Sequence, residues 1–389
     1  MATVLFLSAP AHGNVNPTLG LVAELVKQGE QVIYFTSETF KKAVEATGAT
    51  YAPYVIDMDI FKPLVPGHPR PLPGVIAQAE HVVADILEYI KNIRIDYLIH
   101  SMGFPFASII RQILKVPTIS SLAVFAGLDQ MEKRINSGEN FMGSAEMDAA
   151  YEPVARSIEK RYGIQMPERP LQLLMNRGDL NIVYTSRYFA PESTFFDDSF
   201  IFVGPPIYDR GQQMDFPFDL LEGKDVIYIS LGTVFSNFDK SIYQIFFDAF
   251  KNSPYLVVMA AHQVDLAEVP DNFIVRDYVP QRELLRFTKV AITHAGMNSM
   301  SDLIDQHVPF VSIPLGADQP LLAARANELG ATVVLDHKQL TAEELREAVT
   351  EVTKSSYREN LVKIDQSFRE AGGYPKAVDA IFKLVKGIN

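Results

Sequence analysis

Short apolar runs alternate with helix-like segments along the whole chain, and this alternation constrains the fold more than any other feature of the sequence. Strands that alternate with helices predict βαβ units, in which neighbouring strands run parallel and helices cover both faces of the sheet. The fold class is therefore α/β, with doubly wound parallel sheets. The runs predicted as strands are 3–8, 31–36, 51–56, 95–100, 118–122, 180–185 and 200–203 in the first half, and 226–230, 256–259, 273–276, 290–293, 310–313 and 332–335 in the second.

The chain has 389 residues, which is long for one hydrophobic core, because single cores stop growing at roughly 250–300 residues. We therefore expect two Rossmann-like domains that face each other across a cleft. Residues 204–220, rich in Pro, Gly, Asp and Gln, are predicted to link an N-terminal domain (1–203) to a C-terminal domain (221–372). The last segment, 373–389, is predicted to be a C-terminal helix.

Helix starts can be recognised at two places. Asn16 followed by Pro17 is typical of an N-cap and a first helical turn, which leaves 9–15 as a loop at the carboxyl end of the first strand. Thr341 and Glu344 have the spacing of a capping box and predict an amphipathic helix directly after them.

The composition excludes several classes of function. A formal net charge of −12 gives no electrostatic reason to bind nucleic acid or an anionic membrane, so we expect neither as a partner. The sequence contains no cysteine, which rules out disulfides, a thiolate metal site and a cysteine nucleophile. The apolar start lacks a basic flank, and no apolar run is long enough to cross a membrane. We expect a cytoplasmic protein without membrane insertion.

The region 290–330 carries the residues to which we assign chemistry. A strand over 290–293 ends at a turn of small residues, after which a helix opens. A helix that starts at the carboxyl end of a central strand points unpaired N–H groups and its positive dipole end into the crevice above the sheet, which favours an anion. Three side chains around this turn can donate hydrogen bonds, namely His294, Asn298 and Ser299.

Asp318 and Gln319 follow the next predicted strand, 310–313. Together they supply one carboxylate acceptor and one amide, the pair needed to hold adjacent hydroxyl groups. A phosphate site beside a polyol site predicts a sugar nucleotide as the ligand.

These motifs resemble the donor-binding signature of the family 1, UDP-sugar-dependent glycosyltransferases, which have the two-domain GT-B fold. Residues 278–281 resemble the start of that signature, 230–233 the first strand and loop of the family's second domain, and 11–17 its first N-terminal loop. The resemblance covers nearly the whole chain and is closest to the bacterial macrolide and flavonoid type. It also implies that the C-terminal helix, 373–389, packs back on the N-terminal domain. Within the signature, the matching residues are His294, Gly296, Asn298, Ser299, Asp302, Pro309, Pro314, Asp318 and Gln319.

The resemblance assigns the donor contacts. Val279 would pair with the uracil through its backbone, and Tyr278 would stack on that base, where many relatives have a tryptophan. Asp302 would bind the ribose. The hydroxyls of Ser230 and Thr233 would hold phosphate, although a buried capping hydroxyl also fits these positions. The other expected donor-binding residues are Gln281, His294, Gly296, Asn298, Ser299, Asp318 and Gln319.

We expect no metal to be required, because the helix N-terminus, His294 and hydroxyl donors would neutralise the diphosphate leaving group. The UDP-sugar is a co-substrate, and no tightly bound cofactor is expected. Asp57-Met58-Asp59 formally matches the metal-binding D-x-D motif of a different glycosyltransferase fold, but the order of the surrounding elements does not fit that fold, and a solvated loop is the alternative.

The acceptor pocket is expected in the first domain. A proline-rich loop, 57–74, would form one wall, and the helical region 123–177 another. The expected acceptor-binding residues are Phe61, Phe104, Phe125, Phe141 and Met142, although apolar side chains at such spacings also fit an ordinary core.

In the family, an acceptor hydroxyl attacks the anomeric carbon with inversion and loses its proton to a histidine on the first N-terminal loop, which an aspartate after the fourth strand orients. Here those positions hold Asn14 and Ser101. Asparagine cannot take a proton at neutral pH, and serine cannot stabilise an imidazolium. Losing a general base costs roughly a hundred- to ten-thousand-fold in rate.

Three hypotheses remain open. His12 could be the base, with His100 nearby; acidic acceptors such as phenols could react with little base assistance; or the protein is impaired or non-catalytic and binds UDP-sugar without turnover. A GT-B epimerase or phosphorylase is disfavoured by the placement of Asp318 and Gln319. We expect an inverting hexosyltransferase, monomeric or weakly dimeric, that moves a hexose, with glucose expected, to a hydroxyl of a hydrophobic aromatic or macrolide small molecule.

Overall fold

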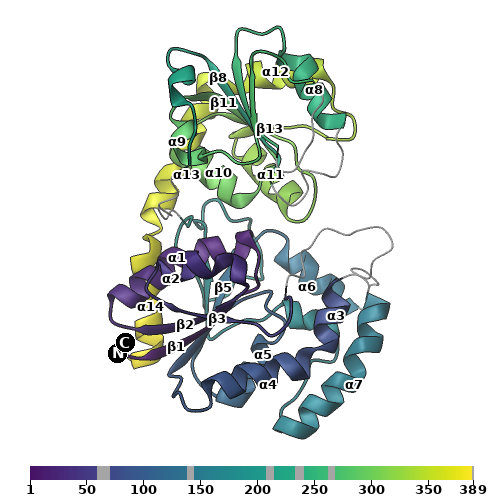
Figure 1. Ribbon diagram of the computed structural model, residues 1–389, viewed down its shortest axis with the longest axis vertical. Coiled ribbons are helices and arrows are strands. Elements are labelled where there is room, and N and C mark those ends of the chain that lie inside the picture. Colours follow the sequence, from purple (N-terminus) through teal and green to yellow (C-terminus); the bar gives the residue numbers. More distant parts are fainter. Residues whose placement is uncertain (59–70, 138–143, 207–213, 233–240, 262–267, 388–389) are drawn as a thin grey trace. The chain divides into compact units, whose positions relative to one another are not determined.

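The computed structural model describes residues 1–58, 71–137, 144–206, 214–232, 241–261 and 268–387. These residues form two compact units, each built on one parallel sheet (Figure 1). The first unit comprises the described residues of Met1–Ser186, Glu192–Tyr208 and Ala371–Asn389, and the second those of Arg187–Pro191 and Asp209–Glu370. The α/β class with two parallel sheets, expected from the alternation of strands and helices, is confirmed.

The sheet of the first unit has seven parallel strands in the order β3-β2-β1-β4-β5-β6-β7. Chain order reverses between β1 and β4, because β2 lies on the other side of β1. The strands are β1 Thr3–Leu7, β2 Gln31–Thr36, β3 Thr50–Pro53, β4 Tyr97–Ser101, β5 Thr118–Leu122, β6 Leu180–Val183 and β7 Phe200–Phe202.

Helices cover both faces of this sheet because successive strand residues point to opposite sides. Val4 and Phe6 pack into one buried core with helices α1 and α14, whereas Leu5 and Leu7 pack into another with α4 and α5. The helices are α1 His12–Lys27, η1 Glu38–Phe40, α2 Lys41–Glu45, α3 Pro71–Ala77, α4 Ala79–Ile90, α5 Ala107–Leu114, α6 Leu128–Ser137, α7 Ser144–Tyr162, η2 Pro170–Leu174 and α14 Gly373–Lys386.

Helix α1 begins at His12, so the predicted start at Asn16 is wrong. Pro17 lies inside the helix, where it lacks the N–H that would bond to the carbonyl four residues earlier. The first turn closes instead on Ala11, whose carbonyl oxygen accepts the N–H groups of Asn14 and Val15 at 2.9 Å. Asn14 therefore sits in the first turn of a helix and not in a loop.

The last helix, α14, packs against α1 in the first unit (Figure 1). The Tyr374 hydroxyl donates to the carbonyl oxygen of Pro17 at 2.9 Å, and the Gly373 N–H donates to the carbonyl oxygen of Val203 at 2.8 Å. A Cβ atom at Gly20 would lie 2.1 Å from the Tyr374 ring, so the ring fits only because residue 20 has no side chain.

The sheet of the second unit has six parallel strands in the order β10-β9-β8-β11-β12-β13. They are β8 Val226–Ser230, β9 Leu256–Ala260, β10 Phe273–Arg276, β11 Thr288–Thr293, β12 Phe310–Ser312 and β13 Thr332–Val334. The helices are η3 Phe218–Leu221, α8 Ser241–Phe250, α9 Gln281–Leu285, α10 Met297–Asp305, α11 Gln319–Glu328, α12 Ala342–Val352 and α13 Ser355–Glu370.

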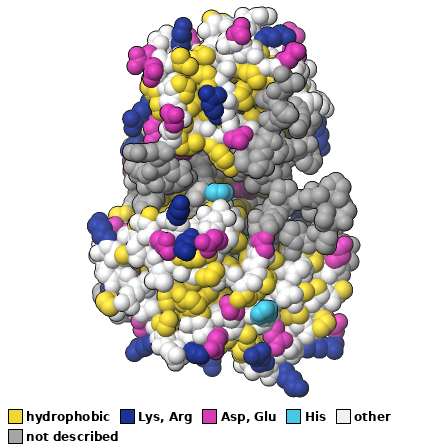
Figure 2. Space-filling view, in the orientation of Figure 1, with side chains coloured by type: hydrophobic (Ala, Val, Ile, Leu, Met, Phe, Trp, Pro, Cys, Tyr) yellow, Lys and Arg dark blue, Asp and Glu magenta, His cyan; other side chains and the backbone are white. Residues whose placement is uncertain are grey.

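The capping box predicted at the start of α12 is confirmed. The Thr341 hydroxyl oxygen accepts the Glu344 N–H at 3.2 Å, and the Glu344 carboxylate accepts the Thr341 N–H at 3.0 Å. On the viewed face of both units, acidic and basic side chains are interspersed (Figure 2). Across the described ranges, no helix combines the length and the apolar character needed to cross a membrane.

Candidate functional site

The candidate donor site lies at the carboxyl ends of β8 and β11, where the chain order of the second sheet reverses. Ser230 pairs with Thr293 in the ladder between these strands, so the two following turns leave the sheet side by side. In open parallel sheets, ligands bind in the crevice outside the carboxyl ends of the strands at such a switch point. The fold therefore places the turn of the sequence motif where a ligand is expected.

The His294 ring is held between two glycines at this point. Its Nδ1 atom lies 3.4 Å from the carbonyl oxygen of Ser230, and the His294 backbone N–H donates to the same oxygen at 3.3 Å. A Cβ atom at Gly232 would lie 2.7 Å from the Nε2 atom of His294, and one at Gly296 would lie 2.5 Å from it. Any larger residue at either position would have to displace the ring.

Burial lowers the pKa of His294 to about 4, and the contact with the Ser230 carbonyl opposes this only in part. The unliganded imidazole is therefore neutral at pH 7. A carbonyl oxygen can only accept, so Nδ1 carries the proton and Nε2 presents a lone pair. His294 would have to gain a proton before its Nε2 could donate to a phosphate.

Helix α10 begins directly after this turn, with Gly296 as its N-cap residue. Gly296 has no side chain to cap the first turn, so the N–H groups of that turn point outward together with the positive end of the helix dipole. Ala295 has a φ of +63°, an uncommon conformation for a residue with a side chain. Asn298 and Ser299 are half-buried in the first turn, as the sequence pattern predicts.

Ser230 is buried, and its hydroxyl oxygen accepts the Gly232 N–H at 3.4 Å. This bond makes Ser230 a capping hydroxyl for its own turn, which was the alternative to a phosphate contact. The predicted phosphate contact of Thr233 lies outside the described residues.

Asp318 and Gln319 begin helix α11 beyond β12. The Gln319 side-chain oxygen accepts the N–H groups of Leu315 and Gly316 at 2.8 and 3.3 Å, so Gln319 also shapes the loop that precedes it. Burial raises the pKa of the Asp318 carboxyl. A carboxylate that gives up hydration in this way gains from a hydroxyl donor.

Two side chains of helix α9 approach the Asp302 carboxylate. The Gln281 amide donates to the Asp302 carboxylate at 2.6 Å, and the Tyr228 hydroxyl donates to the Gln281 amide oxygen at 3.0 Å. The Arg282 guanidinium lies 4.0 Å from the other carboxylate oxygen of Asp302. In this structure Gln281 contacts Asp302, a relationship that sequence spacing did not suggest.

Tyr228 was missed by the sequence reading because it lies in the apolar run Val226–Ser230, which reads as ordinary buried strand. The available signal was a lone tyrosine in an otherwise aliphatic strand, because a buried phenol needs a hydrogen-bond partner. Nearer the expected base-binding position, the Tyr278 side chain is 51% exposed and Val279 is half-buried.

In the first unit, the equivalent switch point lies between β1 and β4. Ser8 follows β1 and Ser101 ends β4, and their hydroxyl oxygens lie 3.3 Å apart. The His12 side chain is exposed on the first turn of α1, with its ring edge-on to Phe40 at 4.9 Å between centroids.

The position of His100 does not fit the hypothesis that it assists His12, because the two side chains lie on opposite faces of the sheet. Strand alternation places it on the Leu98 side of β4, where its Nδ1 atom lies 3.0 Å from the carbonyl oxygen of Ser101. His12 packs on Phe40, which belongs to the core on the opposite face of the sheet.

The described acceptor candidates are buried side chains. Phe104 is fully buried and stacks on Tyr54 at 5.5 Å between ring centroids, and Phe125 is 1% exposed. Their role in acceptor binding stays a prediction beside the alternative of an ordinary core. Three further candidates lie outside the described residues, namely Phe61, Phe141 and Met142.

Within the part of the chain that the structure describes, no three His, Asp or Glu side chains gather in a way that could hold a metal ion. Asp59, the second carboxylate of the D-x-D match, lies outside that part.

The chain is similar to known proteins over its whole length. Residues 218–373 match the family described as UDP-glucoronosyl and UDP-glucosyl transferase. The chain is 35% identical to the uncharacterized UDP-glucosyltransferase YdhE of Bacillus subtilis (strain 168), over 100% of both chains. It is 27% identical to the oleandomycin glycosyltransferase of Streptomyces antibioticus, over 98% of this chain and 90% of that relative. The crystal structure of the glycotransferase of kitacinnamycin superposes with a TM-score of 0.81 at 24% identity, over 98% of each chain.

Proposed function

This chain belongs to the family of UDP-glucuronosyl and UDP-glucosyl transferases and is a glycosyltransferase, and from that premise we propose that it moves a hexose from UDP to a hydroxyl of a hydrophobic small molecule. The observation that carries the proposal is the neutral His294 ring, held between Gly232 and Gly296 at the start of α10. We propose UDP-glucose as the donor because the relative with 35% identity is named a UDP-glucosyltransferase.

In the proposed reaction, the acceptor oxygen attacks the anomeric carbon while the bond from that carbon to the β-phosphate oxygen breaks. The bonding electrons leave with UDP, and the configuration inverts. The outward N–H groups of α10 and the side chains of Asn298 and Ser299 stabilise the negative charge on the leaving diphosphate. His294 adds to this once protonated. Asp318 and Gln319 orient the hexose hydroxyls, and Asp302 holds the ribose.

The scheme needs a route for the acceptor proton, because Asn14 and Ser101 occupy the positions of the family's histidine base and its aspartate. Ser101 faces the Ser8 hydroxyl, and burial raises the pKa of the nearby Tyr34 to about 12, so these groups are neutral at pH 7. We propose that the acceptor hydroxyl is phenolic, because a phenol with a pKa near 10 gives up its proton to water far more readily than an alkanol. His12 is the alternative base.

An aromatic acceptor fits this phenolic route, whereas a macrolide, whose hydroxyls are alkanols, would need His12 as the base. The relative named for oleandomycin supports a small-molecule natural product in this role. The first unit offers buried aromatic side chains, of which Phe104 and Phe125 are the described candidates.

A second candidate function is UDP-sugar binding with little or no turnover. The hydroxyl pair of Ser8 and Ser101 favours it, because neither group can accept a proton from an alkanol at neutral pH.

The test is incubation of the protein with UDP-glucose and matched phenolic and alkanol acceptors, with products read by mass. The proposed function predicts a product heavier by one hexose for phenols. UDP binding in a calorimeter without any product would support the second candidate. Turnover of alkanols that appears only in the double variant Asn14→His with Ser101→Asp would identify a lapsed base.

A further inference from the structure

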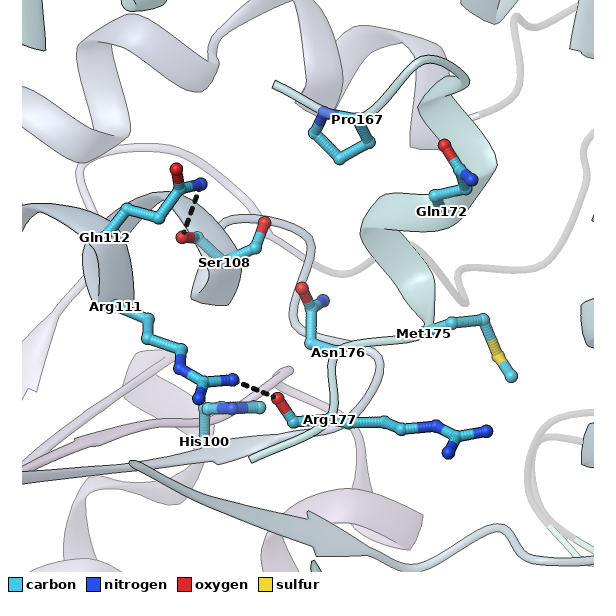
Figure 3. Close-up of a pocket in the computed structure, with 9 residues that line it drawn as sticks. All are labelled: His100, Ser108, Arg111, Gln112, Pro167, Gln172, Met175, Asn176 and Arg177. Atoms are coloured by element: carbon cyan, nitrogen blue, oxygen red, sulfur yellow. Dashed lines mark hydrogen bonds between the residues drawn. The ribbon is translucent and has the colours of Figure 1, made fainter. Parts of the chain in front are cut away.

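A pocket of about 330 Å³ lies in the first unit on the α5 side of the sheet (Figure 3). It is open to solvent on one side and is lined by the end of β4, by α5 and by the segment from Pro167 to Arg177, and we call it the α5 pocket. Its volume is at the small end of the range for ligand sites, roughly 300–1,000 Å³. The side chains that matter for its chemistry are those of His100, Ser108, Gln172 and Asn176.

His100 forms one wall of the α5 pocket and is 1% exposed. Its Nδ1 atom donates to the carbonyl oxygen of Ser101 at 3.0 Å. Burial, helped by the neighbouring Arg111 guanidinium, lowers the pKa of His100 to about 4, so the ring is neutral at pH 7. The Nε2 atom therefore carries a lone pair, and within the described chain no group donates to it.

Asn176 supplies a second acceptor. Its amide nitrogen donates to the carbonyl oxygens of Met102 and Phe104 at 3.2 and 2.9 Å, which fixes the orientation of the amide. Its side-chain oxygen is left without a donor among the residues that the structure describes. The hydroxyl of Ser108, on α5, is buried without a hydrogen-bond partner.

Gln172 supplies a donor. Its side-chain oxygen accepts the Arg169 N–H at 3.0 Å, which leaves its NH₂ group for the pocket. The α5 pocket thus combines two acceptors, one amide donor and one hydroxyl. A buried polar group without a partner costs about 1–3 kcal/mol and is rare in folded proteins, and among the four pocket groups the Ser108 hydroxyl is in this position.

Both arginine side chains at the α5 pocket form ion pairs with carboxylates. The Arg111 guanidinium donates to the carbonyl oxygen of Arg177 at 3.0 Å and forms an ion pair with Asp179. The Arg177 guanidinium turns away from the pocket (Figure 3) and pairs with Glu132 and Asp197 at 3.1 and 3.3 Å. The pocket therefore offers no unpaired charge to a phosphate, a carboxylate or an ammonium group.

We propose that the α5 pocket binds a neutral, polyhydroxylated molecule of about the size of one hexose. Each hydroxyl of such a ligand can donate to His100 Nε2 or Asn176 Oδ1 and can accept from Ser108 or Gln172. A ligand with only acceptors would leave the two lone pairs unpaired, and a charged ligand would lose hydration without gaining a counterion. This site is formed by residues of the first unit alone, and the inference does not depend on the proposed transfer reaction.

The test is calorimetry of the full chain, without nucleotide, with methyl glucopyranoside as the neutral probe and with glucuronate and glucosamine as its acidic and basic counterparts. We expect the neutral probe to bind and both charged probes to bind at least about tenfold more weakly. Ser108→Ala removes one partner, and Gln172→Glu removes the donor while it keeps the bond to Arg169. Each should weaken binding of the neutral probe about tenfold. Ser137→Ala, at an exposed serine of α6, is the matched control and should change nothing.

Four results would overturn the proposal. The first is that the neutral probe does not bind up to roughly 50 mM, and the second is that either charged probe binds as strongly as the neutral probe or more strongly. The third is binding that survives Ser108→Ala and Gln172→Glu but is lost in Asp318→Ala, because the sugar would then occupy the donor site. The fourth is a crystal grown with the probe that contains only water in the α5 pocket.

Discussion

The Nδ1 atom of His294 lies 3.4 Å from the carbonyl oxygen of Ser230, which fixes the imidazole so that its other nitrogen, Nε2, faces Gly232 and Gly296. This one relationship determines which nitrogen carries the proton as well as the direction of the ring, while burial keeps the free imidazole neutral at pH 7. Because the ring must gain a proton before Nε2 can donate, the affinity for a diphosphate should depend on pH.

UDP binding should be accompanied by proton uptake on His294. The pKa is about 4 in the free protein, below the ordinary 6.5, and a bound diphosphate favours the imidazolium and raises it. Affinity should therefore fall as the pH rises from about 4 toward the pKa of the complex, and level off above it. Calorimetry in two buffers of different ionisation enthalpy, near pH 6, measures the uptake. His294→Gln, which cannot titrate, should abolish it; equal uptake in that variant would assign the proton to another group.

Adding a methyl group to either glycine beside His294 should weaken UDP binding. The new Cβ atom would lie 2.7 Å from Nε2 in Gly232→Ala and 2.5 Å in Gly296→Ala, and Gly232 also has a φ of +74°. We expect at least about a tenfold rise in Kd, or about 1.4 kcal/mol. Gly103→Ala, where a Cβ atom meets nothing within 4 Å, is the control. Unchanged affinity in both site variants would mean that the ring position does not matter for binding.

Gln281→Glu should impair ribose binding. It places a second carboxylate where the amide now donates to Asp302 at 2.6 Å, so the two acids repel each other and one of them takes up a proton. We expect the KM for UDP-glucose to rise by about tenfold or more, with a smaller change in kcat. Gln306→Glu creates a comparable carboxylate pair with Asp305, where the amide now donates at 2.7 Å. If Gln281→Glu and Gln306→Glu raise the KM equally, the rise comes from the added negative charge and not from a disturbed ribose contact.

Gly20→Ala should destabilise the first unit, because its Cβ atom would lie 2.1 Å from the Tyr374 ring of α14. Overpacking of this kind costs about 1–3 kcal/mol. Tyr374→Ala also costs stability, but it removes the clash, so the double variant should be more stable than the sum of the single changes indicates. Urea unfolding of the four proteins measures this coupling. Strict additivity would show that α14 does not rest on α1 in solution.

The sequence predicted the architecture well because the fold is encoded by a local repeat. Every expected strand forms, since a short β-branched run between helical segments has few other ways to bury itself. The helix start at His12 was missed because Asn16 and Pro17 form a strong local cap signal, whereas the actual first turn closes on the Ala11 carbonyl.

The sequence predicted residues for the candidate donor site but not the contacts between them. The spacing of His294, Asn298 and Asp318 placed them near strand ends. It did not reveal that Ser230 sets the tautomer of His294, or that Tyr228 and Gln281 hold Asp302. These partners come from other strands and helices, and no local pattern relates them.

The sequence by itself thus determined the two parallel α/β sheets and the turn at which a sugar nucleotide is expected, because strand–helix alternation and glycine-marked turns are properties of neighbouring residues. Only the tertiary structure decided that α14 packs on α1 and that residues 187–191 pack with the second unit, where Arg325 donates to the carbonyl oxygens of Tyr188 and Phe189 at 2.9 and 3.2 Å. Those outcomes depend on residues more than a hundred positions apart that fill the same space, and the contact of Gly20 with Tyr374 is fixed by volume and not by sequence pattern.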